Sequence, residues 1–110
     1  MTSIDPYRVT DKLDDTVLDA IATRLELRGK HPAFVRMMDE YLDAMGIDRA
    51  KAVIDLGCGT GVAARRIARR SGFSGRVTGI DRSPFLIRAA RRLAGEESVA
   101  GRIDFRIGDT

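Results

Sequence analysis

Residues 51–61 read Lys-Ala-Val-Ile-Asp-Leu-Gly-Cys-Gly-Thr-Gly, and this stretch decides the fold. The run 52–56 is apolar, rich in β-branched residues and broken at Gly57, which predicts a strand buried on both faces. The three glycines that follow allow positive φ and let backbone N–H groups approach a ligand closely. Apolar residues from position 62 onward recur at a helical period, so the loop leads into a helix N-terminus. A strand, a glycine loop and a helix in this order predict a nucleotide-type binding site.

The spacing of the glycines separates two kinds of cofactor. A dinucleotide site requires G-x-G-x-x-G, and its third glycine falls where this chain has Val62. The pattern here is G-x-G-x-G, preceded by Asp55 inside the predicted strand. Residues 53–61 resemble motif I of the class I S-adenosylmethionine-dependent methyltransferases. A tight turn from strand to helix, without a ligand, is the alternative interpretation.

A second acid ends the next predicted strand, Arg76–Asp81. A carboxylate at this place can accept two ribose hydroxyl hydrogens, and Asp81 lies 24 positions after Gly57, close to the roughly 20 typical of dinucleotide sites. The resemblance agrees, because methyltransferases of this class place an acid here for the ribose of S-adenosylmethionine. Capping of the following helix is the alternative role, and Ser83 with Pro84 at the first helical position suits it better.

The third predicted strand, 102–107, alternates apolar and charged residues, which indicates a half-exposed edge strand. Gly108-Asp109 follows it. In the resembled class an acid after the third strand commonly hydrogen-bonds the adenine amino group, so the resemblance implies this role for Asp109; ordinary turn chemistry is the alternative. The cofactor-binding residues implied in this way are Asp55, Gly57, Cys58, Gly59, Thr60, Gly61, Asp81, Arg82 and Asp109. None of them is identified as a catalytic base, and no metal site is predicted.

Two helices are predicted before the glycine loop. Residues 1–8 contain Pro6 and no periodicity, which indicates an extended arm whose Tyr7 either contacts the pocket or anchors the arm. Thr10 or Asp11 can cap the first helix, which ends near Gly29. Many small-molecule methyltransferases carry two helices here as a cap over the cofactor. The resemblance therefore assigns residues 1–48 to an arm and helical cap.

The second of these helices begins at His31-Pro32 and ends at Gly46. Its predicted buried face consists of Phe34, Val35, Met38, Tyr41, Leu42 and Met45. His31 is the only histidine of the chain and stands beside a proline, without a partner histidine or a nearby cysteine. It is therefore interpreted as a turn residue rather than as a metal ligand or a base.

Composition narrows the possible functions. The chain has 110 residues, of which 44% are hydrophobic and 32% charged, as in one soluble globular domain. A single cysteine, Cys58, excludes an internal disulfide framework and a multi-cysteine metal site. No apolar stretch reaches the roughly 18 residues of a membrane span, and the N-terminus has no apolar signal core. We therefore expect a cytoplasmic location and no membrane partner.

Charge is distributed unevenly along the chain. Residues 1–50 hold seven basic and ten acidic side chains, whereas residues 51–110 hold twelve and six. Much of the basic excess lies on the outer faces of two predicted helices, at Arg65, Arg66, Arg69, Arg70, Arg88, Arg91 and Arg92. Solvated helix faces are the preferred interpretation, and binding of RNA or acidic lipid is the alternative. No aromatic residues are interleaved for base stacking, so nucleic acid is disfavoured and a small-molecule methyl acceptor is expected.

The resemblance covers residues 51–110 well and residues 1–50 loosely, and it assigns residues 49–110 to the N-terminal half of an S-adenosylmethionine-binding domain. The expected fold is α/β: a Rossmann-like partial parallel sheet of three strands, with helices on both faces and an N-terminal helical cap. Compared with the resembled seven-stranded fold, we expect the C-terminal half to be absent from these 110 residues. In the resembled strand order, third, second, first, fourth, the first strand then keeps one unpaired edge. We expect a homo-oligomer, or a separate C-terminal fragment, to cover that edge.

The resemblance implies that the complete protein is an S-adenosylmethionine-dependent methyltransferase. This chain would supply its cofactor-binding portion and would transfer no methyl group alone. Two alternatives stay open. One is an NAD(P)-binding oxidoreductase fragment, which Val62 disfavours, and the other is a non-catalytic dimerisation or regulatory module of the same fold.

Overall fold

The computed structural model of the chain describes residues 14–109. Its elements, in chain order, are α1 (Asp15–Lys30), α2 (Pro32–Met45), η2 (Ile47–Arg49), β1 (Ala52–Leu56), α3 (Val62–Arg69), β2 (Arg76–Asp81), α4 (Pro84–Glu96), η3 (Ala100–Arg102) and β3 (Ile103–Ile107). The three predicted strands are confirmed. No described helix is long and apolar enough to cross a bilayer. The predicted arm, Tyr7 and the proposed caps Thr10 and Asp11 lie outside the described residues.

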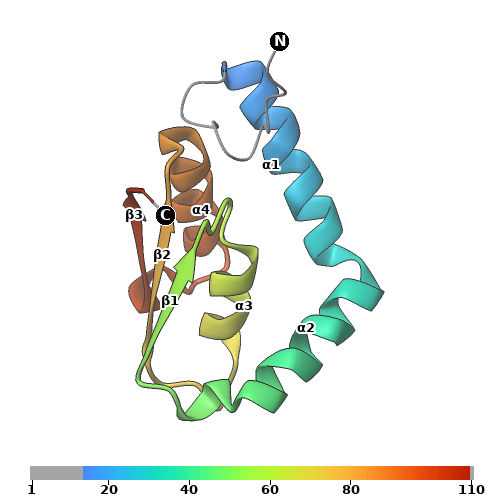
Figure 1. Cartoon of the computed structure of the whole chain (residues 1–110), viewed down its shortest axis with the longest axis vertical. Coiled ribbons are helices and arrows are strands. Elements are labelled where there is room, and N and C mark those ends of the chain that lie inside the picture. Colours follow the sequence, from blue (N-terminus) through green and yellow to red (C-terminus); the bar gives the residue numbers. More distant parts are fainter. Residues whose placement is uncertain (1–13, 110) are drawn as a thin grey trace.

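The three strands form one parallel sheet in the order β1-β2-β3. Val77 of β2 lies opposite Val53 on one side and Ile103 on the other. Each connection passes through a helix and moves in the same direction across the sheet, so right-handed crossovers place α3 and α4 on the same face. In Figure 1 α3 lies between the sheet and the bent pair of helices α1 and α2. The predicted α/β, Rossmann-like fold is therefore confirmed.

One detail of the predicted fold is wrong for residues 14–109, because the helices cover a single face of the sheet. Side chains of β1 that point toward the helices, such as Val53, pack on the core. The intervening side chains of Ile54 and Leu56 are 66% and 64% exposed. The apolar run of β1 predicts burial on both faces, but that burial needs a second layer, and the described residues provide only one. β1 is thus an edge strand with an uncovered apolar face.

Side chains at the helix ends set the boundaries of α1 and α2. Asp14 caps α1, its Oδ1 accepting a 3.0 Å hydrogen bond from the Val17 N–H, in place of the predicted Thr10 or Asp11. His31 caps α2 through Nδ1, which accepts from the Ala33 N–H at 3.1 Å. The prediction of a turn residue at position 31 is therefore confirmed.

Only part of the predicted apolar face of α2 is buried. Leu42 is 4% exposed and joins the core, and Met38 packs partly against it. Tyr41 and Met45, which were predicted to be buried, are 64% and 58% exposed. Only a narrow stripe of α2 contacts the core, so the remainder of the predicted face points away from it.

Arg65 of α3 and Arg70 differ from the expected solvated face, whereas Arg69 is exposed as predicted. The Arg65 side chain is only 4% exposed, and that of Arg70, which follows α3, is 18% exposed. Acidic residues from preceding elements meet both: Arg70 Nε lies 2.7 Å from Asp48 Oδ1, and its guanidinium also pairs with Asp43. By contrast the arginines on the outer face of α4, Arg88, Arg91 and Arg92, are exposed as predicted.

Candidate functional site

A cavity of about 560 Å³ opens at the carboxyl ends of β1 and β2, beneath α1 and α2. This volume falls in the range of small-molecule sites. Its lining includes seven of the predicted site residues: Asp55, Gly57, Cys58, Gly59, Thr60, Asp81 and Arg82. Gly61 and Asp109 are not part of the lining.

The glycine loop is fastened to the end of β2 by its own backbone. The N–H groups of Gly57 and Cys58 both donate to the Ile80 carbonyl oxygen, at 2.8 and 3.0 Å. The glycines at 57, 59 and 61 all have positive φ. At Gly61, where φ is 83°, a Cβ atom would lie 2.7 Å from Cζ of Phe105, so only glycine fits. Gly61 therefore lets the start of α3 approach β3, which is a structural rather than a ligand-facing role.

Asp81 joins the loop to α4. Its carboxylate is largely buried and accepts two hydrogen bonds of 2.9 Å, Oδ2 from the Gly59 N–H and Oδ1 from the Ser83 N–H. Ser83 in turn caps α4, its Oγ accepting from the Leu86 N–H at 3.1 Å, as the sequence predicts. A carboxylate has about four acceptor positions. Asp81 therefore orders the loop and keeps acceptor capacity on a residue that lines the cavity.

Few backbone donors of the loop remain for a ligand. The N–H groups of Gly57, Cys58 and Gly59 donate within the chain, as described above. The Gly61 N–H also donates, to the Cys58 carbonyl oxygen at 2.9 Å, so four N–H groups of the loop are engaged. The Thr60 N–H and the first-turn N–H groups of Val62 and Ala63 have no acceptor among the described residues. All three residues line the cavity. The positive end of the α3 dipole adds to the pull of these donors on a ligand acceptor.

Two carboxylates make one wall of the cavity electronegative. Burial, and secondly the charge of Asp81, raise the pKa of Asp55 above its ordinary value of 3.8. Burial and the same two carboxylates raise the pKa of Cys58 to about 12. The Cys58 thiol is therefore protonated at neutral pH and is no nucleophile. A cationic ligand group placed against this wall would relieve the repulsion between the carboxylates.

Arg82 and Asp109 lie at one end of the site. Arg82 lines the cavity, and its Nε lies 3.5 Å from Asp109 Oδ1. The Asp109 side chain is 98% exposed and lies outside the lining. The role in adenine recognition that the resemblance implies for Asp109 stays a prediction.

Sequence reasoning missed the other half of the lining, which the helices supply. These residues are Leu25 and Arg28 of α1, Phe34 and Met38 of α2, Val62 and Ala63 of α3, and Leu86 of α4. The Arg28 guanidinium carbon lies 5.8 Å from the centre of the Phe34 ring. Phe34 and Met38 stand one turn apart on the predicted apolar face of α2. The periodicity of α2 predicts this apolar face. The bend between α1 and α2 turns the face toward the glycine loop, and no local sequence pattern predicts that bend.

Comparison with known proteins identifies the same region. Residues 47–110 match the model of a methyltransferase domain family. Chloroplastic tocopherol O-methyltransferase of Arabidopsis thaliana is 32% identical over 94 residues, which cover 80% of this chain and 26% of the relative. Trans-aconitate 2-methyltransferase of Streptomyces avermitilis is 42% identical over 57 residues, which cover 52% of this chain and 21% of the relative.

A solved structure shares the fold. An RNA methyltransferase from Salinibacter ruber, in complex with S-adenosyl-L-homocysteine, matches with a TM-score of 0.61 at 35% identity, covering 67% of this chain and 47% of that one. This chain spans about a quarter or less of the length of the two curated relatives. The match to the family model extends over more than half of the chain and includes the glycine loop, β2 and β3. The chain belongs to the methyltransferase domain family.

Proposed function

We propose that the cavity binds S-adenosylmethionine and that the chain is the cofactor-binding portion of a methyltransferase acting on a small molecule. The observation that carries this proposal is the buried Asp81 carboxylate, which holds the glycine loop and also lines the cavity. Family membership supports it independently.

The residues present fit the chemical groups of this cofactor. Its ribose has two hydroxyl donors, which suit the remaining acceptor positions of Asp81. Its sulfonium and ammonium groups are cationic, and they suit the wall where Asp55 and Asp81 repel each other. Nonpolar walls from Leu25, Met38 and Leu86 suit the apolar surface of the nucleoside and of the methionine chain.

The cofactor also carries a carboxylate, and Arg28 is the residue we assign to it. The Arg28 guanidinium lines the cavity beside Phe34, and it forms no ion pair with any carboxylate of residues 14–109. The bound amino acid would thus meet both a cationic and an anionic part of the cavity lining. This arrangement would fix the orientation of the ligand as well as its presence.

When bound, S-adenosylmethionine supplies an electrophilic methyl group on sulfur. The contribution of this chain is to bind and orient, because alignment of donor and acceptor supplies most of the rate in such a displacement. Asp81 keeps the glycine loop in place, and Leu25, Met38 and Leu86 supply nonpolar lining to the cavity. The Cys58 thiol, protonated because its pKa is about 12, does not compete for the methyl group.

Isothermal titration of the purified chain with S-adenosylhomocysteine and, separately, with NAD tests the proposal. We expect saturable binding of S-adenosylhomocysteine and none of NAD. The preference has a structural reason: Val62, at the position of the third dinucleotide glycine, packs so closely on α1 that a Cβ at Gly29 would lie 2.8 Å from its Cγ1. Binding of NAD in preference would replace the proposal with the oxidoreductase alternative, and binding of neither ligand would favour the non-catalytic module.

We also propose that the chain self-associates, or takes up a complementary segment, along β1. Support comes from the exposed Ile54 and Leu56 and from the edge of this strand, which no other strand within residues 14–109 pairs with. We propose separately that the protein is cytoplasmic, and this proposal rests on the sequence alone. Fractionation of the native host cells tests it.

A further inference from the structure

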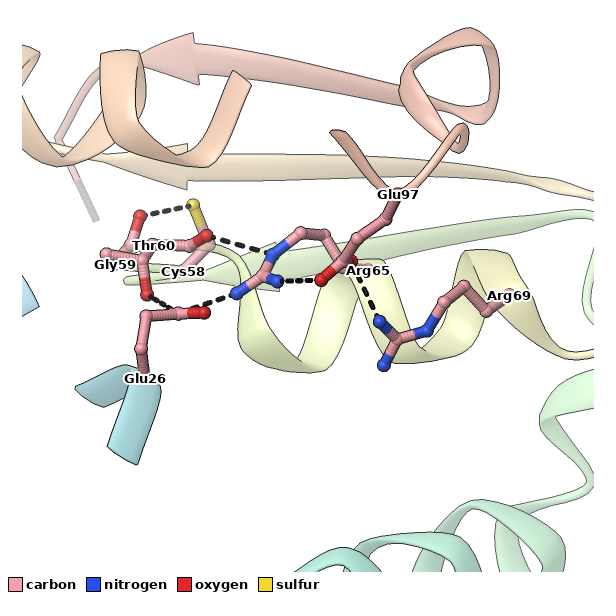
Figure 2. Close-up of polar contacts among 7 residues, drawn as sticks. All are labelled: Glu26, Cys58, Gly59, Thr60, Arg65, Arg69 and Glu97. Carbon is pink, nitrogen blue, oxygen red and sulfur yellow. Dashed lines mark hydrogen bonds and ion pairs between the residues drawn. The ribbon is translucent and has the colours of Figure 1, made fainter. Parts of the chain in front are cut away.

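Arg65 is the most deeply buried charged side chain among the described residues, and the site described above does not use it. Its side chain projects from α3 and contacts Glu26, Thr60 and Glu97. We call these four residues the Arg65 cluster. Figure 2 shows the Arg65 guanidinium meeting three separate segments of the chain. Nη2 lies 2.6 Å from Glu26 Oε2 of α1, Nη1 lies 2.6 Å from Glu97 Oε2, and Nε donates to the Thr60 carbonyl at 3.3 Å.

Glu26 is shared between the arginine and the glycine loop. The same Oε2 atom that pairs with Arg65 also accepts a 2.6 Å hydrogen bond from the Thr60 hydroxyl. Thr60 is fully buried, and its carbonyl and hydroxyl are thus held by two members of the cluster. One turn of α1 therefore fixes a loop residue that lies 34 positions further along the chain.

The charges of the cluster are balanced at its outer end. Glu97 Oε1 lies 2.8 Å from Arg69 Nη1, so acidic and basic residues alternate in the series Glu26, Arg65, Glu97 and Arg69. A buried ion pair gives little net stability compared with apolar packing, and its best-attested use is to specify one arrangement among several. The polar geometry of the cluster therefore indicates positioning rather than bulk stabilisation.

The cluster borders the cavity. Leu25 precedes Glu26 on α1 and lines the cavity, and a Cβ at Gly59 would lie 3.1 Å from Leu25 Cδ1. Any movement of α1 away from the loop would open the cavity and break the Glu26 bonds together. Conversely, a ligand that orders the loop would hold Thr60 in the position that Glu26 requires.

We propose that Arg65 and Glu26 are positioning residues that fasten α1 to the glycine loop, so that docking of α1 and occupancy of the cavity stabilise each other. The ligand half of this statement rests on the proposed function, whereas the fastening of α1 does not. Coupling between the two events is reciprocal by thermodynamic necessity. The bonds of Arg65 and Glu26 and the bound ligand both shift the same local equilibrium, between docked and undocked α1.

Amide hydrogen exchange of the whole chain, with and without S-adenosylhomocysteine, tests the proposal in Arg65→Met and Glu26→Gln. Met has a volume similar to that of Arg and packs well in place of a buried ion pair. Arg70→Met is the matched control, because Arg70 is also paired with acids near α3 but lies at the other end, away from the loop. We expect faster exchange of α1 and of residues 58–61 in both cluster variants, with α1 unchanged in the control.

The effect of the ligand on exchange of α1 distinguishes this coupling from a merely structural role of Arg65. In the wild-type chain S-adenosylhomocysteine should slow exchange of α1, and this slowing should vanish in Arg65→Met, with affinity about tenfold lower from the lost charge-assisted bonds. Arg65→Lys should restore part of the affinity, since one ammonium replaces only part of the guanidinium fork. If α1 exchanges alike in wild type and Arg65→Met, or if Arg70→Met accelerates α1 equally, the proposal is wrong. A wild-type chain that does not bind the ligand would refute only the proposed function, and the ligand-free comparison would still decide the role of Arg65.

Discussion

The Asp81 carboxylate and the Gly59 N–H are joined by a 2.9 Å hydrogen bond between residues 22 positions apart. This bond brings the end of β2 against the glycine loop, while Glu26 of α1 and Arg65 of α3 hold Thr60, the next loop residue. The loop therefore has two independent attachments. One comes from the sheet and the other from α1 and α3.

Asp81→Ala should weaken binding of S-adenosylhomocysteine more than any other single aspartate substitution. Loss of a charge-assisted hydrogen bond costs about 1.5–3 kcal/mol, or roughly 10- to 150-fold in affinity. Isothermal titration measures the change. Asp104→Ala, at a half-exposed site on β3, is the control and should leave affinity unchanged. An unaltered affinity in Asp81→Ala would remove this residue from the site.

The raised pKa of Asp55 predicts a specific dependence of stability on pH. Because burial disfavours the ionised form in the folded state, the cost of ionisation is absent below the ordinary pKa of 3.8, grows as pH rises and is complete above the raised folded-state pKa. Asp55→Asn should therefore increase the free energy of unfolding at neutral pH and flatten this part of the pH dependence. Urea unfolding between about pH 4 and pH 7 measures both effects.

The same substitution should weaken binding of a cationic ligand, so that stability is gained while affinity is lost. Asp104→Asn removes an equal charge from an exposed position and controls for net charge. An Asp55→Asn variant that is less stable than wild type at neutral pH would contradict the assignment of an energetic cost to this carboxylate.

Gly61→Ala should destabilise the fold by about 2 kcal/mol or more, because the residue has φ of 83° and its new Cβ would meet the Phe105 ring at 2.7 Å. Gly95→Ala is the matched control. A Cβ there meets nothing within 4 Å, and the residue lies in the last turn of α4, so a gain of about 0.5 kcal/mol is expected. Thermal unfolding distinguishes the two, and equal midpoints would show that Phe105 yields without cost.

Self-association along β1 should respond to Ile54→Lys. The wild-type side chain is 66% exposed on an edge strand, and a lysine at such a position opposes pairing with another chain. Light scattering at micromolar concentration should give an oligomer for wild type and a monomer for the variant. Because Ile54 packs little within the chain, the free energy of unfolding of the monomer should change by no more than about 0.5 kcal/mol. Wild-type protein that scatters as a monomer would contradict the proposed assembly.

Local patterns were enough to predict the strands and the loop. The first two strands have the predicted bounds, and the third begins one residue later than predicted because Arg102 closes a short 3-10 turn. The glycine spacing and the position of Asp81 place most of the cavity floor correctly, since the carboxyl ends of neighbouring parallel strands meet at one edge.

The residues that sequence reasoning misplaced depend on contacts between distant segments. Arg65 and Arg88 belong to similar arginine runs, yet only Arg65 meets acids from other elements and becomes buried. Tyr41 shares the period of Met38, but only a narrow stripe of α2 reaches the core. Local periodicity predicts neither outcome, because both depend on how α1 and α2 pack against the segments that follow them in the chain.

The high pKa of Cys58 makes the alkylation rate of this thiol a probe of loop opening. A thiol whose pKa is about 12 reacts very slowly with alkylating reagents while the loop is closed, since only the thiolate attacks. If the loop opens and Cys58 loses its burial, the same sulfur should react as an ordinary cysteine, and no other cysteine in the chain contributes to the signal. The rate of native-state alkylation thus reports the fraction of molecules that are transiently open, without any engineered probe.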